Sequence, residues 1–143
     1  MCSECIRERL AAASRGSRLA FGISMKLSGP RVLLQLEGFC VLVAASLVYH
    51  AGGHAWWKFF VFFLAPDLAM IGYALGARIG AATYNAAHTY AVVGALWLLG
   101  HFLGIASVSP ICLIWVAHIG FDRLLGAGLK YPSGFKDTHL GRV

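Results

Sequence analysis

The stretch VLLQLEGFCVLVAASLVY, residues 32–49, contains one charged residue, Glu37, in a predominantly apolar run. An α-helix rises about 1.5 Å per residue, so a run of this length covers most of a hydrocarbon core about 30 Å thick. The run shows no regular alternation of polar and apolar residues, which argues against a transmembrane β-strand. It therefore predicts a membrane-spanning helix.

Three more apolar runs follow, at about residues 56–75, 79–99 and 105–125. Hydrophobic residues make up 59% of the 143-residue chain and charged residues 13%, which is too apolar for a soluble domain of this size. The connections between the runs are short, so consecutive helices are expected to be antiparallel. The sequence thus predicts an all-α integral membrane protein whose single domain, residues 29–127, is a four-transmembrane-helix antiparallel bundle.

Basic residues set the expected orientation of this bundle. Eleven of the twelve lysines and arginines lie before the first run, between the second and third, or at and beyond the end of the fourth; Lys58 is the exception. Such residues are retained on the cytoplasmic side of membranes, so both termini are expected in the cytoplasm. The net charge of +6 suits an anionic inner leaflet. Because the basic residues follow the membrane boundary, the expected partner is the lipid bilayer and not nucleic acid.

The two ends of the chain are expected to lie outside the membrane domain. Residues 1–28 form a basic leader that we expect to be disordered, with Met25 as an alternative translation start. Its Cys2–Cys5 pair has CxxC spacing, but no second pair completes a zinc site. Residues 128–143 form a cytoplasmic C-terminal tail, for which three arrangements stay open: it folds back over the domain, lies along the membrane interface, or is disordered.

Six polar side chains interrupt the apolar runs at a similar depth. An ionisable group at membrane depth is costly and indicates a functional site by default. From the rise of a helix, they lie about 9–18 Å from the basic boundary, so all four runs contribute to one polar layer in the cytoplasmic half of the bilayer. Residues three or four apart share a helix face, which pairs Asn85 with His88 and His118 with Asp122. These candidates for an inter-helix pocket are Glu37, Asp67, Asn85, His88, His118 and Asp122.

Three functions fit this polar layer. Imidazole and carboxylate groups match the ligand sets of zinc, manganese and iron, and the predicted ligands are Asp67, His88, His118 and Asp122. A metal there could activate water for hydrolysis of a lipid-like substrate. The same groups without metal could relay protons in a small proton-coupled transporter. A network that only fixes helix register, in a structural or assembly subunit, is the third interpretation, so the biochemical function stays open.

Two local features concern the second run. Pro66 frees a backbone carbonyl one turn earlier and predicts a kink beside Asp67. Gly72, Gly76 and Gly80 recur every four residues, which permits close helix packing, or association with a second copy or another membrane protein. Gly76 and Gly80 also favour the tight turn between the second and third runs.

Four sequence strings stand out beyond these patterns: LAPD at 64–67, YNAAHT at 84–89, WVAHIGFDR at 115–123 and GLKYPSGFKDTHLG at 128–141. Together they resemble a small bacterial membrane family, the domain of unknown function 4260, over about residues 31–143. The resemblance implies a multi-pass protein of the bacterial cytoplasmic (inner) membrane. It implies no activity, substrate or cofactor.

Overall fold

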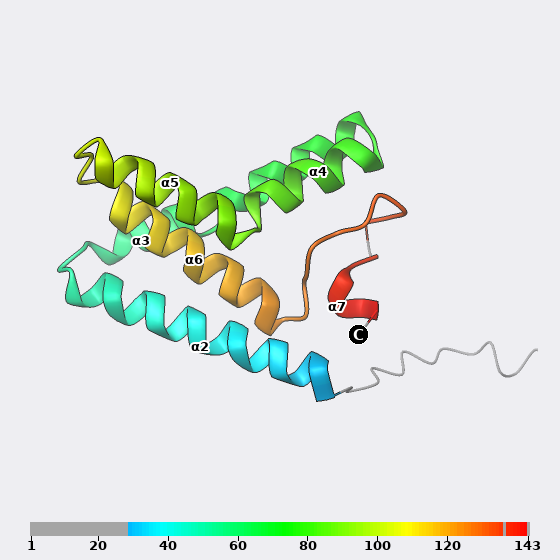
Figure 1. The fold of residues 1–143 in the computed structure, drawn as a ribbon, viewed down its shortest axis with the longest axis horizontal. Helices are drawn as coiled ribbons and strands as arrows, with labels where there is room; N and C mark the ends of the chain where they lie inside the picture. The colour runs from blue at the N-terminus through cyan, green and yellow to red at the C-terminus, as the bar shows by residue number, and fades with distance from the viewer. Residues whose placement is uncertain (1–28, 136, 143) are drawn as a thin grey trace, which may run out of the picture.

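The computed structural model describes residues 29–135 and 137–142, and the leader with Met25 lies outside these described residues (Figure 1). The described part of the chain is helical, and the only pairing of extended backbone in it is an isolated bridge between Lys130 and Thr138. The prediction of an all-α structure is confirmed for these residues. The helices are α2 (Gly29–Ala51), α3 (Trp56–Phe63), the 3-10 helix η2 (Ala65–Leu75), α4 (Ala77–Ala87), α5 (Tyr90–Phe102), α6 (Val108–Leu124) and α7 (His139–Arg142).

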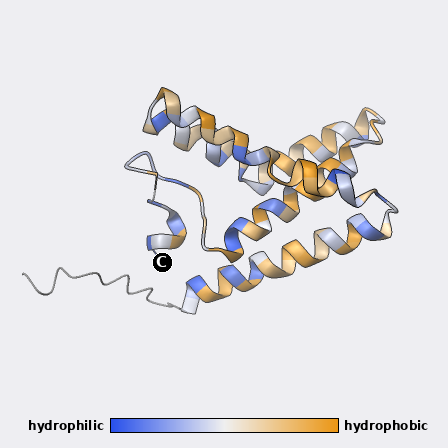
Figure 2. Cartoon of the chain, turned by 180° about the vertical axis from the view of Figure 1, so that it is seen from behind, coloured by the Kyte–Doolittle hydropathy of each residue, from blue (hydrophilic) through white to orange (hydrophobic). Residues whose placement is uncertain are grey.

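Two segments of the described chain are long and apolar enough to cross a membrane. They are Gly29–Ala51 and Trp56–Leu75, with mean hydropathies of 2.0 and 1.5. Only 17% and 11% of their most apolar windows are buried inside the protein. Figure 2 shows hydrophobic residues along the length of these helices. Exposed apolar surface of this extent is rare on soluble monomers and is typical of surfaces that contact lipid.

The second segment changes its helix type at Pro66. The α-helix α3 ends at Phe63, and η2 continues in the 3-10 pattern, with Asp67 N donating to Leu64 O at 3.1 Å. Proline has no N–H to donate, and its ring clashes with the carbonyl oxygen four residues earlier, so the α-helical ladder cannot pass through Pro66. A 3-10 helix of more than about four residues is uncommon, so η2 is an irregular segment, and it carries the Asp67 carboxylate in its first turn.

The expected continuous helix over residues 79–99 is corrected by the structure. Helix α4 ends at Ala87 and α5 begins at Tyr90, because Thr89 is extended, with φ −112° and ψ 131°. In an unbroken helix the Ala87 carbonyl would accept from the N–H four residues later. Instead it accepts a hydrogen bond of 2.6 Å from the Trp115 indole on α6. A tertiary contact thus satisfies the carbonyl that the interruption leaves free.

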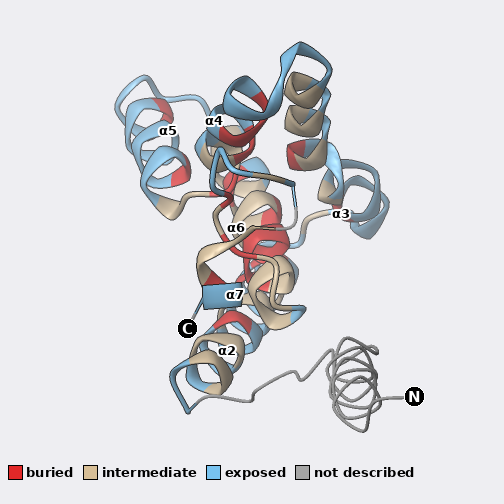
Figure 3. Ribbon diagram, turned by 90° about the vertical axis from the view of Figure 1, so that its right-hand side faces the viewer, coloured by how far each residue is buried: buried red, intermediate tan, exposed pale blue. Residues whose placement is uncertain are grey.

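Helix α6 is the centre of the packing. It contacts α2, α3, α5 and η2, and Figure 3 shows the buried residues concentrated on it. Helices α2 and α6 run side by side in opposite directions (Figure 1) and touch through two glycines. A methyl group at Gly38 would lie 2.7 Å from the Gly120 carbonyl oxygen, and one at Gly120 would lie 2.8 Å from the Gly38 carbonyl oxygen. The two backbones are therefore in direct contact.

The three glycines of the second run have separate surroundings. A methyl group at Gly72 would overlap Thr83, and one at Gly80 would overlap the Tyr73 ring, so both permit the packing of η2 against α4. Gly76 has a φ of +115° and no atom within 4 Å of a methyl placed on it. It forms the turn between η2 and α4 with a positive φ, which residues that carry a side chain rarely adopt.

The C-terminal tail folds back onto the helices. Its backbone is joined by the Lys130–Thr138 bridge and by a hydrogen bond of 3.0 Å from His139 N to Leu129 O, and Leu140 is fully buried. Arg142 donates two hydrogen bonds to the Asp137 carboxylate, at 2.9 and 2.6 Å, and this pairing lowers the pKa of Asp137 to about 2. Of the arrangements left open by the sequence, the described residues of the tail adopt the fold-back.

Candidate metal centre

Four polar side chains from three segments of the fold, two of them irregular or interrupted, converge between the helices. Asp67 lies in the first turn of η2, directly after Pro66, and His88 follows the last residue of α4, where the third run is broken. His118 and Asp122 lie one turn apart on α6. The proline before Asp67 and the spacing of four between His118 and Asp122 are local features of the sequence, whereas the helix end at His88 is a break that the apolar pattern did not predict.

The ligating atoms of these residues form a compact group. His88 Nε2 lies 3.1 Å from His118 Nε2, 3.3 Å from Asp122 Oδ2 and 3.4 Å from Asp67 Oδ1. His118 Nε2 lies 3.5 Å from Asp67 Oδ1 and 4.0 Å from Asp122 Oδ2. All four atoms are within 4.8 Å of one another. We call this group the His–Asp cluster.

The spacing matches a single tetrahedral metal ion. Zinc binds histidine nitrogen and carboxylate oxygen at about 2.0–2.2 Å, which puts tetrahedral ligand atoms about 3.4 Å apart. Five of the six separations in the cluster are between 3.1 and 4.0 Å. The 4.0 Å separation would have to shorten by about 0.6 Å, and the Asp67–Asp122 separation, which is at most 4.8 Å, by up to about 1.4 Å. The cluster is therefore a group that could bind a metal ion once its carboxylates move inward.

The charge balance of the cluster also favours a cation. The His88 and His118 side chains are 3% and 1% exposed, whereas those of Asp67 and Asp122 are 36% and 15% exposed. In the described part of the chain, these two histidines are the only basic side chains with a nitrogen within 4.0 Å of either carboxylate. With neutral imidazoles the cluster carries two negative charges, which the more distant Lys130 ammonium balances only in part, so a cation or protons would stabilise it.

A hydrogen bond to the backbone places a proton on Nδ1 of His88. Its Nδ1 lies 2.9 Å from the Tyr84 carbonyl oxygen, which can only accept, so Nδ1 carries the proton and donates it. When the ring is neutral, this tautomer presents the lone pair of Nε2 to the cluster. Metal-binding histidines usually donate their second ring nitrogen in this way. His118 differs, because its Nδ1 is buried without a hydrogen-bond partner, beside the Phe63 ring.

Tyr84 supports the cluster from two sides, although the sequence analysis did not identify it. Its hydroxyl donates to Asp122 Oδ2 at 2.8 Å, and its ring stacks on His88 with centroids 3.7 Å apart. Tyr84 precedes His88 by four residues and therefore shares its helix face. That spacing was the signal available in the sequence.

We expect Tyr84→Phe to weaken metal binding at the cluster by about 10–100-fold, the usual effect of removing an outer partner of a ligand. The substitution keeps the ring that stacks on His88 and removes only the hydrogen bond to Asp122. Competition with a chromogenic zinc chelator measures the affinity. Tyr131→Phe, which removes a hydroxyl from the tail, is the matched control and should bind like the wild type. Equal affinity of the two variants would contradict the role given to Tyr84.

Asn85 contacts the tail. Its side-chain amide donates to the Lys130 carbonyl at 2.8 Å and accepts from the Lys130 N–H at 2.7 Å. The Lys130 side chain is only 8% exposed, and its ammonium lies 4.3 Å from the centroid of the Tyr84 ring. Burial lowers the pKa of Lys130, while Asp122 and Asp67 act in the opposite direction. The tail thus places a positive charge behind Tyr84, a contact that the sequence analysis missed.

Glu37 has a different position from the one expected. It is exposed on α2 and is not one of the residues of the His–Asp cluster. Its neighbour Gly38 is buried against α6. Adjacent residues on a helix point about 100° apart, so Glu37 is turned away when Gly38 faces α6.

Comparison with known proteins identifies one family. Neither curated proteins nor solved structures gave a match to the chain. One family model, described as "Domain of unknown function (DUF4260)", matches residues 31–143, which include the whole His–Asp cluster and the folded tail. Most of the chain is covered by this match, and the protein therefore belongs to the family of domain of unknown function 4260.

Proposed function

We propose that the His–Asp cluster binds one divalent transition metal, and that the metal site activates water for hydrolysis. The observation that carries the proposal is the approach of four ligating atoms to within 4.8 Å of one another. Two imidazoles with two carboxylates in a tetrahedral arrangement favour zinc over manganese, which prefers octahedral oxygen ligands. Iron remains the alternative that metal analysis distinguishes.

Differences in burial suggest different roles for the four residues of the cluster. His88, His118 and Asp122 are the more buried ligands, which suits three firm ligands of a catalytic site. Asp67 is the most exposed, so in the catalytic form of the site water would take its place as the fourth ligand, and the Asp67 carboxylate would be free to act as the base. The metal supplies Lewis acidity for attack by water. For an ester, the water oxygen bonds to the acyl carbon, the bond to the alcohol oxygen breaks with its electron pair, and Asp67 accepts a water proton and passes it to the alcohol.

Metal analysis of the full chain, purified in detergent, tests the proposal. We expect about one equivalent of zinc per chain, and hydrolysis of a p-nitrophenyl ester that chelation removes and zinc restores. Asp67→Asn should retain part of the metal and lose the hydrolysis. Glu37→Gln, which neutralises an exposed carboxylate outside the cluster, should retain both. A folded protein without stoichiometric metal would overturn the proposal.

A transport pathway is the second candidate, and the interrupted helices favour it. Irregular backbone at membrane depth is tolerated where it lines a cavity, and transporters place ion sites at such breaks. The cluster lies at two breaks, after Pro66 and at His88. Protein in liposomes should then move zinc or protons across the membrane, with uptake altered by Asp67→Asn. Hydrolysis without uptake favours the first function.

We further propose a multi-pass protein of the bacterial cytoplasmic membrane, with four crossings and both termini in the cytoplasm. The charge asymmetry of the sequence supports this orientation. Helix α6 has 17 residues, about 26 Å of helix, and α4 with α5 would together form the interrupted third crossing. A reporter fused after Val143 should be active in the cytoplasm, and one inserted at residues 52–54 should be active only outside it. Cytoplasmic activity at residues 52–54 would reverse the assignment.

A further inference from the structure

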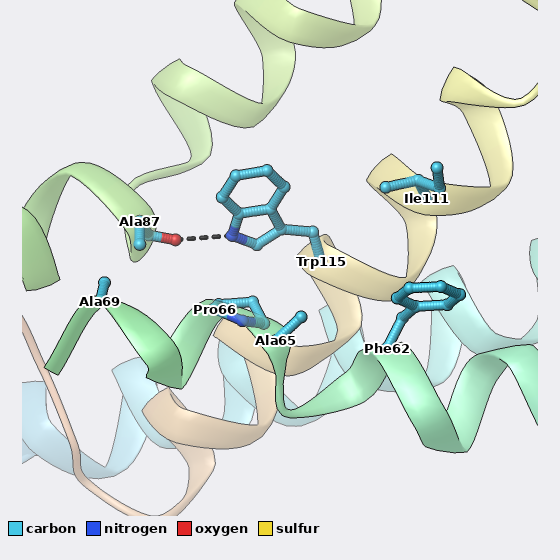
Figure 4. Close-up of a pocket in the computed structure, with 7 residues that line it drawn as sticks. All are labelled: Phe62, Ala65, Pro66, Ala69, Ala87, Ile111 and Trp115. Atoms are coloured by element: carbon cyan, nitrogen blue, oxygen red, sulfur yellow. Dashed lines mark hydrogen bonds between the residues drawn. The ribbon is translucent and has the colours of Figure 1, made fainter. Parts of the chain in front are cut away.

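An apolar groove of about 270 Å³, a size near the lower end of ligand pockets, lies between the same three segments that supply the His–Asp cluster. It lies between the α3–η2 segment, the end of α4 and the first half of α6 (Figure 4). Its lining residues are Phe62, Ala65, Pro66, Ala69, Ala87, Ile111 and Trp115.

The groove and the cluster share their backbone segments. Pro66 directly precedes Asp67, and Ala87 directly precedes His88. Trp115 lies three residues before His118 on α6, on the same side of that helix. Three of the four proposed ligands therefore have a groove residue within one helical turn. The groove and the cluster thus lie between the same three segments, within about one helical turn of each other along the chain, and none of the four cluster residues lines the groove itself.

The chemistry of the groove wall selects for hydrocarbon. The single polar side-chain group in the lining is the Trp115 indole, and its N–H is already bonded to the Ala87 carbonyl. Three of the other lining residues are alanines, and Phe62 and Ile111, which lie at one end of the groove, are exposed (Figure 4). The wall thus offers no free hydrogen-bond donor to a polar group, and its open side continues into the apolar surface of the helices.

We propose that this groove holds the hydrocarbon chain of an amphiphilic substrate, whose oxygen-containing head reaches the His–Asp cluster. The inference rests on the proposed metal function and names the substrate class for it: a molecule with an alkyl or acyl chain joined to an ester head. Lipid tails are as apolar as the groove wall, so the chain gains little from transfer alone. The groove instead fixes the position of the head relative to the cluster, which is the larger contribution of binding to catalysis.

Photo-crosslinking of the zinc-loaded full chain in detergent tests this assignment. The probe is a long-chain alkyl hydroxamate, whose head binds metal and whose chain carries a diazirine. After irradiation, peptide mapping should place the label on the groove, at Phe62, Ala69 or Ile111. Chelation of the metal should reduce this labelling, and a matched alkyl amide, which lacks the metal-binding head, should label the groove poorly.

Filling the groove gives the decisive comparison. Ala69→Phe should reduce the labelling by about tenfold, because the new ring occupies the space of the chain, while the metal content stays at the wild-type value. Ala95→Phe, the same change at an exposed position of α5, should label like the wild type. Ala65→Leu, at another point of the groove, repeats the test if Ala69→Phe does not yield monodisperse protein.

Measuring metal on the same samples distinguishes a failure of the groove assignment from a failure of the metal site. Stoichiometric metal with labelling unchanged in Ala69→Phe, or spread over lipid-facing residues such as Leu33 and Phe102, would overturn the groove assignment and leave the metal site standing. Absence of metal from the wild type, with equal labelling by hydroxamate and amide, would overturn both proposals.

Discussion

Replacing His118 with alanine is expected to reduce the metal content of the purified protein from about one equivalent to less than about a tenth. His118 is 1% exposed, and its Nε2 lies within 4.0 Å of the ligating atoms of the other three cluster residues. No other histidine or carboxylate of the described chain belongs to the cluster, so nothing nearby can take its place. The loss should be larger than in Tyr84→Phe, since a ligand and not its outer partner is removed. Elemental analysis after size-exclusion chromatography measures it.

His101→Ala is the matched control, because His101 is an exposed histidine stacked on Trp97 at the end of α5. It should keep the full metal content and the wild-type elution profile. If the two variants lost metal equally, the bound metal would sit elsewhere, on surface histidines. If His118→Ala stayed folded and kept its metal, the cluster would not be the binding site.

Gly120→Val is expected to destabilise the protein by at least the upper end of the about 1–3 kcal/mol typical of overpacked cores. A first methyl group at Gly120 would already lie 2.8 Å from Gly38 O and 2.8 Å from Leu42 N. Both are backbone atoms of α2 and cannot rotate away as a side chain can. Helices α2 and α6 must therefore separate, which exposes the contact that holds His118 and Asp122 in place. Thermal unfolding in detergent, followed by circular dichroism, measures the fall in Tm.

Gly94→Val makes the same substitution in α5, where no atom lies within 4 Å of a methyl placed on the glycine. It should change the Tm little, since valine and glycine differ modestly in helix propensity and nothing is displaced. An equal fall in Tm for both variants would mean that the α2–α6 contact is not specially sensitive. A stable Gly120→Val protein would show that the two helices can move apart without cost.

Local sequence features determined a large part of this structure. The apolar run at 56–75 coincides with the segment Trp56–Leu75, and the run at 32–49 lies inside α2. Pro66 ended the α-helix where its missing N–H and its ring required. The spacing of four placed His118 and Asp122 on one face of α6. These outcomes depend only on residues close in sequence, which is why composition and periodicity could predict them.

Tertiary contacts decided the rest. The break at His88 depends on the Trp115 indole, which is 28 residues away and bonds the freed Ala87 carbonyl. Depth along a helix placed Glu37 in the polar layer, but the rotation of α2 is set by the Gly38–Gly120 contact, which turns Glu37 outward. Lys130 reaches Tyr84 only because Asn85 holds the tail backbone. Local patterns along the chain predicted α2, the Trp56–Leu75 segment and the shared face of His118 and Asp122. The packing of distant backbones decided where the third run breaks and which polar residues meet, because helix rotation and tail docking depend on contacts that no local pattern contains.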